Sequence, residues 1–323
     1  MALYFFRAKI ISRSSGSSAV AAAAYRSAGR LYDERRERTH NFSNKAGVVH
    51  SEILLPHGAN ERWLVRQRLW NDVEAAAIRK DAALAREIVF TIPSEMTQGQ
   101  GVELARDFVR REFVERGMIA DLNVHWDMGA DGHANRHAHV MLTMREVRIG
   151  EDGTSEFGLR VRDWDRKALL FHWRAAWADH VNERLALLDI DARIDHRSLK
   201  AQEIELRPQN RLSFEAWHMA AQGIHTAPLA EYIAIAQSNG EKIIANPAIA
   251  LDAITHGQAT FTTRDLAVCV HRCSHGKEQF DAVMAAVISS PELIALGKDA
   301  RGDKRFTSRS MIETEERLER ATI

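Results

Sequence analysis

The sequence has little cysteine, no net charge and no long hydrophobic run, and each absence excludes a class of protein. Only two cysteines, Cys269 and Cys273, occur among 323 residues, which excludes a disulfide scaffold and a zinc site built from cysteines. No apolar run approaches the ~18 residues of a membrane span. Arg7 and Lys9 stand where the apolar part of a signal peptide would lie. We therefore expect a soluble, cytoplasmic protein without membrane insertion.

Positive charge is concentrated near the N-terminus, although the whole chain is neutral. Lys and Arg number 44 and Asp and Glu also number 44. Residues 1–45, however, contain nine Lys and Arg against three acidic residues, a local excess of six positive charges. This uneven distribution indicates an anionic partner for the N-terminal region.

Hydrophobic periodicity predicts alternating strands and helices over the first two thirds of the chain. Strands are expected at residues 2–12, 48–55, 84–92, 122–126 and 137–145, helices at residues 19–38, 61–80, 97–116 and 165–188, and a hairpin extension at residues 151–162. This order predicts an α+β domain with a central, mainly antiparallel sheet flanked by helices. After Pro208 the expected helices are short and interrupted by Gly and Pro. We therefore predict a first domain at residues 1–210 and a smaller, mostly helical segment at residues 211–323.

Three histidines are the candidate ligands of a metal ion. His137 and His139 are two residues apart on an expected strand, so both rings point to one face of the sheet. His125 lies on the preceding expected strand. If the two strands are neighbours, three imidazoles converge as in a metal site that keeps positions open for substrate. His133, in the polar loop between the strands, is the alternative third ligand; His125 is preferred because a strand holds a side chain more rigidly.

Tyr25 is the candidate nucleophile. A phenol has a pKa of ~10 and reacts poorly until a metal, a base or a nearby cation lowers its proton affinity. Taken alone, one aromatic residue on an Ala-rich helix is more often part of the core. Here the flanking alanines leave room for a substrate, and Arg26 and Arg30 add positive charge.

Together these segments resemble the MobA/MobL family of conjugative relaxases, in its TraA-like branch, which have the fold of His-hydrophobe-His endonucleases. The matching segments are SSAVAAAAYRSAG around Tyr25, REIVFTIPSEM around Glu87, NVHWD and NRHAHVMLTMR around the histidines, and IDHRSLKAQEIELRPQ at residues 194–209. One departure is Arg136, which stands where the family often has a proline before the second histidine. We expect it to loosen the entry into the strand and to spare the ligands.

The resemblance implies nicking of one DNA strand at a plasmid origin of transfer. Tyr25 would attack a phosphodiester of single-stranded DNA, which leaves a 5′-phosphotyrosyl link and a free 3′-OH. A divalent metal on His125, His137 and His139, usually Mg²⁺ or Mn²⁺ in the family, would stabilise charge on the phosphorus. Glu87 would orient a histidine or accept the tyrosine proton. Other components of the relaxosome and of type IV secretion are the further partners implied.

Several other assignments stay open from the sequence. Arg7, Lys9, Arg26 and Arg30 suit contacts to backbone phosphates, and Trp126 suits stacking on a base. The last ~70 residues resemble the opening segment of the helicase that follows the relaxase in TraA-like proteins, but no G-x-x-x-x-G-K-[ST] sequence is present. ATP hydrolysis is therefore not expected of this chain.

Two alternative functions also remain open. One is a metallohydrolase in which the same three histidines activate water and Tyr25 is structural. The other is a non-catalytic module that binds single-stranded DNA. A covalent protein–DNA adduct would distinguish the relaxase from both.

Overall fold

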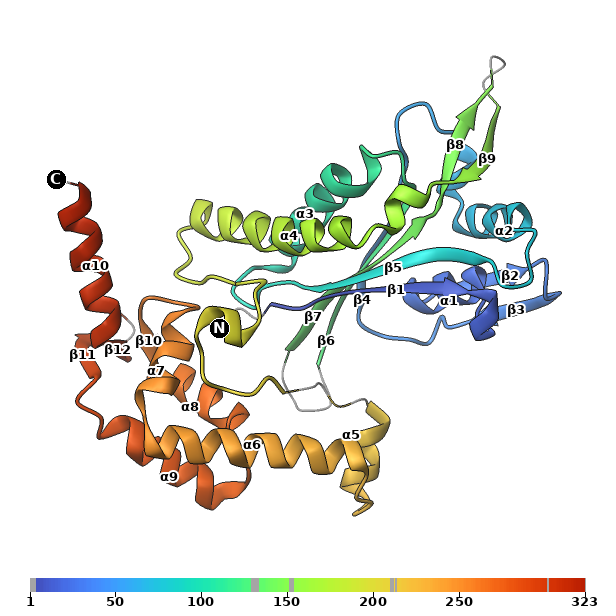
Figure 1. Cartoon of the computed structure of the whole chain (residues 1–323). Helices are drawn as coiled ribbons and strands as arrows, with labels where there is room; N and C mark the ends of the chain where they lie inside the picture. The colour runs from blue at the N-terminus through green and yellow to red at the C-terminus, as the bar shows by residue number, and fades with distance from the viewer. Residues whose placement is uncertain are drawn as a thin grey trace. The chain divides into compact units, whose positions relative to one another are not determined.

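The computed structural model describes residues 4–128, 134–150, 154–209, 212, 214–300 and 302–322 (Figure 1). The chain divides into two compact units, one that ends at Arg184 and one that begins at Leu185. Each unit is described by itself. None of the helices in the described ranges is long and apolar enough to span a membrane.

The first unit is built on a five-stranded sheet in which all neighbouring strands are antiparallel. The strand order is β1-β5-β7-β6-β4. The strands are β1 (Phe6–Ser12), β4 (Val48–Leu54), β5 (Ala83–Thr91), β6 (Ala120–Met128) and β7 (Ala134–Thr143). The expected α+β architecture with a central antiparallel sheet is confirmed.

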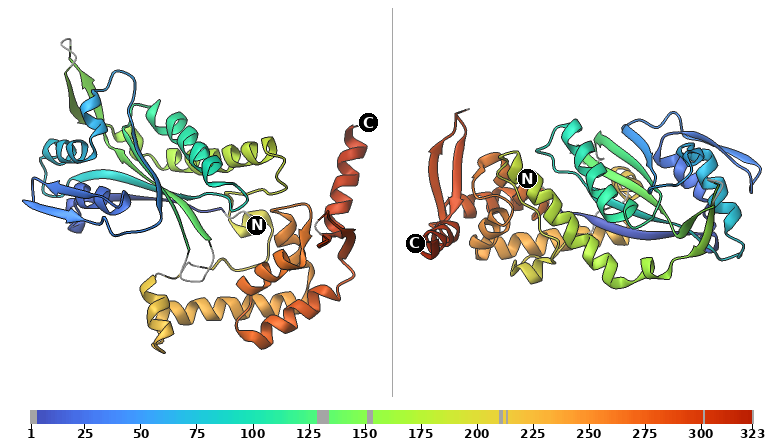
Figure 2. Two further views of the ribbon diagram at one scale, coloured as in Figure 1. Left: turned by 180° about the vertical axis from the view of Figure 1, so that it is seen from behind. Right: turned by 90° about the horizontal axis from the view of Figure 1, so that it is seen from above.

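Helices cover both faces of this sheet. Successive side chains of a strand point to opposite faces, and apolar side chains on each face pack against helices. On one face, Phe90 of β5 contacts Phe108 of α3 (Gln98–Val109) and Trp177 of α4 (Lys167–Leu187), with ring centroids 5.6 and 4.1 Å apart. Figure 2 shows this helical layer from behind and from above. On the other face, α1 (Ala19–Arg26) and α2 (Arg66–Ala76) enclose a second apolar cluster at one end of the strands.

Shorter elements complete the first unit. They are the 3₁₀ turns Arg13–Ser15, Glu61–Leu64 and Arg162–Asp165, the π-helical segment Arg110–Val114, and the hairpin of β8 (Arg145–Ile149) and β9 (Ser155–Arg160). The last of these begins before the hairpin extension expected at residues 151–162.

The helix expected at residues 19–38 is wrong beyond Arg26. The chain instead turns at Ala28, whose φ is 51°, and forms a hairpin of β2 (Arg30–Asp33) and β3 (Arg38–Asn41). The charged residues of this segment favour a solvated helix when considered locally. In the folded chain the buried carboxylate of Asp33 accepts hydrogen bonds from Ser18 Oγ and from the Arg36 backbone, so a contact distant in sequence overrides the local preference.

The second unit is mostly helical and has its own core, which includes Ile254, Phe261 and Val283. Its helices are the 3₁₀ turn Leu199–Gln202, α5 (Phe214–Ala221), α6 (Ala227–Ala245), α7 (Ala248–Thr255), α8 (Thr263–Arg272), α9 (Gly276–Ile288) and α10 (Arg309–Thr322).

A small antiparallel sheet accompanies these helices. Its strands are β10 (Phe261–Thr262), β11 (Leu293–Lys298) and β12 (Lys304–Ser308), in the order β10-β12-β11. Along the chain the order is α7, β10, α8, α9 and then the β11–β12 hairpin. Residues 185–209 belong to this second unit, and the assignment of a functional domain to residues 1–210 stays a prediction.

Candidate metal and nucleophile site

The histidine cluster, defined as His125, His137 and His139, forms on β6 and β7. These strands are neighbours, and His125 lies directly opposite His137 in their register. The three ring centroids are 4.8 to 5.0 Å apart, and one nitrogen from each ring lies within 4.8 Å of the other two. This is the convergence expected from the spacing. His133, the alternative ligand, lies outside the described residues.

One nitrogen of each ring donates a hydrogen bond to a protein oxygen. His125 Nε2 donates to the Arg26 carbonyl at 2.7 Å, His137 Nδ1 donates to the Asn135 carbonyl at 3.0 Å, and His139 Nδ1 donates to Glu87 Oε1 at 2.8 Å. A neutral imidazole with its proton on that nitrogen has its lone pair on the other. Metal-binding histidines in proteins are fixed by such partners, so the donor set fits a divalent cation.

The electrostatic environment keeps two of these rings, those of His125 and His139, neutral. Burial, reinforced by the charge of Lys45, lowers the pKa of His125 to about 3. Burial also lowers the pKa of His139, against the opposing effect of Glu87. Neutral imidazole is the form that binds a metal ion, so both rings are in the binding form at neutral pH.

Glu87 lies under the cluster at the centre of a charged group. Its side chain is 1% exposed, it accepts a hydrogen bond from Arg26 Nε, and Lys9 Nζ lies 2.9 Å from its Oε2. Burial alone would raise the pKa of Glu87, but the hydrogen bonds from His139 and Arg26 and the Arg26 charge hold it far below its ordinary value. The carboxylate is therefore ionised at neutral pH and is a weak base.

Tyr25 lies near the end of α1, on its solvent side. The side chains of Ala19, Val20, Ala23 and Ala24 are buried, whereas Tyr25 is 48% exposed. Its ring makes an edge-to-face contact with Phe42, with centroids 5.3 Å apart. The next residue, Arg26, contacts both His125 and Glu87. Tyr25 is therefore followed directly in the chain by the residue that contacts the histidine cluster.

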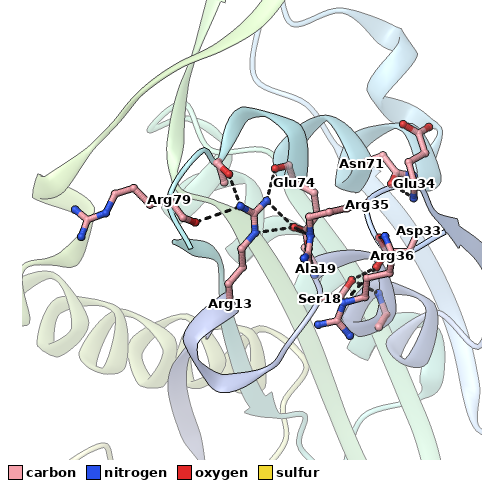
Figure 3. Close-up of polar contacts among 12 residues, drawn as sticks. Arg13, Ser18, Ala19, Asp33, Glu34, Arg35, Arg36, Asn71, Glu74 and Arg79 are labelled. Carbon is pink, nitrogen blue, oxygen red and sulfur yellow. Dashed lines mark hydrogen bonds and ion pairs between the residues drawn. The ribbon is translucent and has the colours of Figure 1, made fainter. Parts of the chain in front are cut away.

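The start of α1 is fastened by two buried carboxylates that the sequence analysis did not single out (Figure 3). Glu74 of α2 accepts a hydrogen bond from the Ala19 backbone at 3.0 Å and ion pairs from Arg13 and Arg35 at 3.0 and 2.9 Å. Asp33 accepts a hydrogen bond from Ser18 Oγ, and Ser18 is the N-cap residue of α1. Phe42 and Lys45 were also missed, because no motif or spacing links them to Tyr25.

The candidate DNA contacts differ in exposure and in the element that carries them. Arg7 and Lys9 are exposed on the edge strand β1, in register with Val89 and Glu87, so they lie on the face that carries the cluster. Arg26 is buried and paired with Glu87. Arg30 is exposed on β2.

Trp126 is not brought together with the cluster. It lies on the opposite face, where it packs beside Gly101 of α3 and below the Arg136 guanidinium, 4.5 Å from the ring centroid. Stacking of a base on Trp126 therefore stays a prediction from the sequence.

A polar cavity of about 430 Å³ lies beside α1. Its lining includes Lys9, Arg26, Arg36 and residues 15–18. Because Lys9 and Arg26 also contact Glu87, this cavity adjoins the charged group under the cluster.

Comparisons with known proteins find relatives named for conjugal transfer and mobilization. The conjugal transfer protein TraA of Agrobacterium fabrum (strain C58 / ATCC 33970) is 33% identical over 367 residues, an alignment that covers all of this chain and 32% of that protein. The mobilization protein MobL of Acidithiobacillus ferridurans is 34% identical over 237 residues, which covers 66% of this chain and 62% of that protein. The chain thus spans about a third of the length of the TraA relative.

A solved structure and a protein family also match. The structure is described as the molecular basis of vancomycin resistance transfer in Staphylococcus aureus; it is 33% identical, has a TM-score of 0.55, and covers 61% of this chain and 100% of that chain. The MobA/MobL family matches residues 17–222, which is more than half of the chain. This chain belongs to the MobA/MobL family.

Proposed function

We propose that this chain nicks one strand of DNA at an origin of transfer by metal-assisted transesterification, with Tyr25 as the nucleophile. The observation that carries the proposal is the histidine cluster, joined through Arg26 to the helix end that presents an exposed tyrosine. Relatives named for conjugal transfer and mobilization support the same reading.

His125, His137 and His139 would hold the metal, because their rings converge and each is oriented by a protein oxygen. When bound, a divalent cation supplies Lewis-acid stabilisation of the non-bridging phosphate oxygens. Three imidazoles alone favour Zn²⁺, Ni²⁺ or Cu²⁺ by affinity. We propose Mg²⁺ or Mn²⁺, whose binding the phosphate oxygens of the substrate would assist.

The remaining residues account for a balanced reaction. The Tyr25 phenol loses its proton to solvent, its oxygen bonds to phosphorus, and the bond from phosphorus to the 3′ oxygen breaks; that oxygen takes up a proton. One ester replaces another, so the strand can be rejoined without ATP. Arg7 and Lys9 bind backbone phosphates on the same face.

Glu87 was left with two roles by the sequence, and we propose the first. It orients His139 and balances the charges of Lys9 and Arg26. A carboxylate whose pKa is held this low is poorly suited to accept the tyrosine proton.

The test is a covalent adduct. Single-stranded oligonucleotides that tile the transfer origin of the chain's own plasmid are incubated with the protein and Mn²⁺, and an SDS-stable shift is sought. We expect an adduct with the wild-type chain and none with Tyr25→Phe, which keeps the packing of the ring. Tyr32→Phe, at an exposed tyrosine on β2, is the matched control and should behave as wild type.

Two outcomes would support the alternatives instead. Multiple-turnover cleavage without an adduct, retained by Tyr25→Phe, would indicate a metallohydrolase. Binding without cleavage under any metal would indicate a DNA-binding module.

We also propose that the chain acts in the cytoplasm with other relaxosome and type IV secretion components.

A further inference from the structure

Lys45 holds the ring of Tyr25 from one face. Its Nζ lies 4.0 Å from the ring centroid and donates a hydrogen bond to the Tyr25 carbonyl at 3.2 Å. This carbonyl belongs to the last turn of α1, where a cation also interacts favourably with the helix dipole. With Phe42 in edge-to-face contact, the exposed tyrosine is held by two residues of one segment, the chain between β3 and β4.

That segment is packed tightly against the strand that carries His125. The Gly47 carbonyl accepts a hydrogen bond from the Trp126 backbone at 2.7 Å, and a Cβ at Gly47 would lie 2.9 Å from the Asp127 Cβ. Gly47 also has a φ of +88°, which L side chains rarely adopt. The close approach requires glycine and holds the segment that carries Lys45 against β6.

The charge of Lys45 acts on the groups of the site. It contributes to the lowered pKa of His125, and Asp127, Glu87 and Arg26 are the charged groups that act on Lys45 itself. Burial lowers the pKa of Lys45, against the effect of the two carboxylates. A half-buried ammonium is less screened by water than a surface one, so it interacts more strongly with a developing negative charge.

We propose that Lys45 is a positioning residue of the nicking reaction, which orients the Tyr25 ring and stabilises the negative charge that the phenol acquires as its proton leaves. The inference rests on the proposed role of Tyr25. A cation over the face of an aromatic ring is attracted to it, and the attraction increases when the ring becomes anionic. The phenol loses its proton to solvent, and Lys45 keeps its own.

The test compares single-turnover rates of adduct formation for Lys45→Met and Lys45→Arg between pH 7 and pH 10. Met keeps the length of the side chain and removes the charge, whereas Arg keeps the charge and the contact with the ring. We expect Lys45→Met to slow the reaction about 10- to 100-fold at pH 7, because the variant loses the attraction between a partly buried cation and the developing negative charge. We expect Lys45→Arg to restore most of the rate.

The difference in the rate of adduct formation between Lys45→Met and the wild type should become smaller as the pH rises, because hydroxide then removes the phenol proton without the help of a cation. A purely structural defect would lower the rate by the same factor at every pH. Lys80→Met, at an exposed lysine in the same unit, is the matched control and should leave the rate unchanged. Thermal melting and oligonucleotide affinity are measured for each variant.

Two results would overturn the proposal. One is a wild-type rate for Lys45→Met; the other is a pH-independent loss that follows a loss of DNA affinity, which would make Lys45 a phosphate contact. If Lys45→Met does not fold, Lys45→Arg is compared with the uncharged variant Lys45→Gln. The proposal is contradicted if Lys45→Arg folds but forms the adduct no faster than Lys45→Gln. Absence of any adduct with the wild-type chain would instead refute the proposed function.

Discussion

At the scale of the residue, Glu87 is the group on which most of the site depends. It accepts hydrogen bonds from His139 and Arg26 and pairs with Lys9, and these partners come from three different elements. A carboxylate behind a metal-binding histidine fixes the ring and raises its basicity as a ligand. Glu87 therefore both orients the His139 ring and balances the positive charges of Arg26 and Lys9.

Replacement of Glu87 by glutamine should weaken metal binding. Gln has nearly the same shape but no charge, so His139 loses its anionic partner and two cations lose their counter-charge. We expect the affinity for Mn²⁺ to fall about 10- to 100-fold, as for other partners of metal ligands, in isothermal titration calorimetry. Glu146→Gln, at a carboxylate on the β8–β9 hairpin, is the control. Unchanged affinity in Glu87→Gln would remove Glu87 from the site.

At the scale of the element, the α3–α4 layer holds the sheet from the face opposite the cluster. His180 of α4 is buried and donates from Nε2 to the Leu104 carbonyl of α3 at 3.1 Å. Burial, together with the charges of Arg111 and Arg184, lowers the pKa of His180 below its ordinary value. The neutral ring is therefore part of the folded contact between the two helices.

This contact predicts a loss of stability in mild acid. Between the ordinary histidine pKa of ~6.5 and the lower value in the fold, the unfolded chain binds more protons than the folded one, so the free energy of unfolding falls as the pH is lowered. His180→Gln can keep a donor to Leu104 but does not titrate.

The pH dependence is measured by urea unfolding, followed by tryptophan fluorescence, between pH 7 and pH 5. The free energy of unfolding should change less with pH for His180→Gln than for the wild type. The difference between the two slopes is at most ~1.4 kcal/mol per pH unit for one proton. His57→Gln, at an exposed histidine, serves as the control. Equal slopes for His180→Gln and the wild type would contradict the prediction.

At the scale of the whole molecule, the site and the division of the chain are separate features. All proposed site residues precede Arg145, within the first compact unit. The family match at residues 17–222 extends past the division at Arg184 and Leu185. A cut after residue 210 leaves α4 whole but separates residues 185–210 from the rest of the second unit.

Truncation to residues 1–210 should leave a folded chain that forms the adduct. About 200 residues suffice to bury a core, and the sheet with its two helical layers is complete in this length. Thermal melting, oligonucleotide affinity and adduct yield are compared for residues 1–210 and 1–323. An unfolded or inactive short form would show that the catalytic domain needs residues after 210; weaker DNA binding alone would indicate that the second unit assists binding.

Periodicity alone predicts the five strands of the central sheet, their two faces and the three histidines. The alternation of polar and apolar residues at 137–142 is a local signal, because side chains of a strand point alternately to its two faces. The same signal placed His125 on a second strand. The alanines and arginines around Tyr25 marked it as the candidate nucleophile, and the resemblance then supplied Glu87, since a lone glutamate has no period of its own.

The contacts of these residues follow from how the elements pack in three dimensions. Local pattern does not determine that β5 pairs between β1 and β7, so the sequence did not show that Glu87 would meet Lys9, Arg26 and His139. The β2–β3 hairpin replaced an expected helix because Asp33 binds Ser18 in the folded chain. Lys45 meets Tyr25 across twenty residues because Gly47 lets the backbone approach β6. Such contacts depend on packing between elements, whereas propensity and periodicity describe one element at a time.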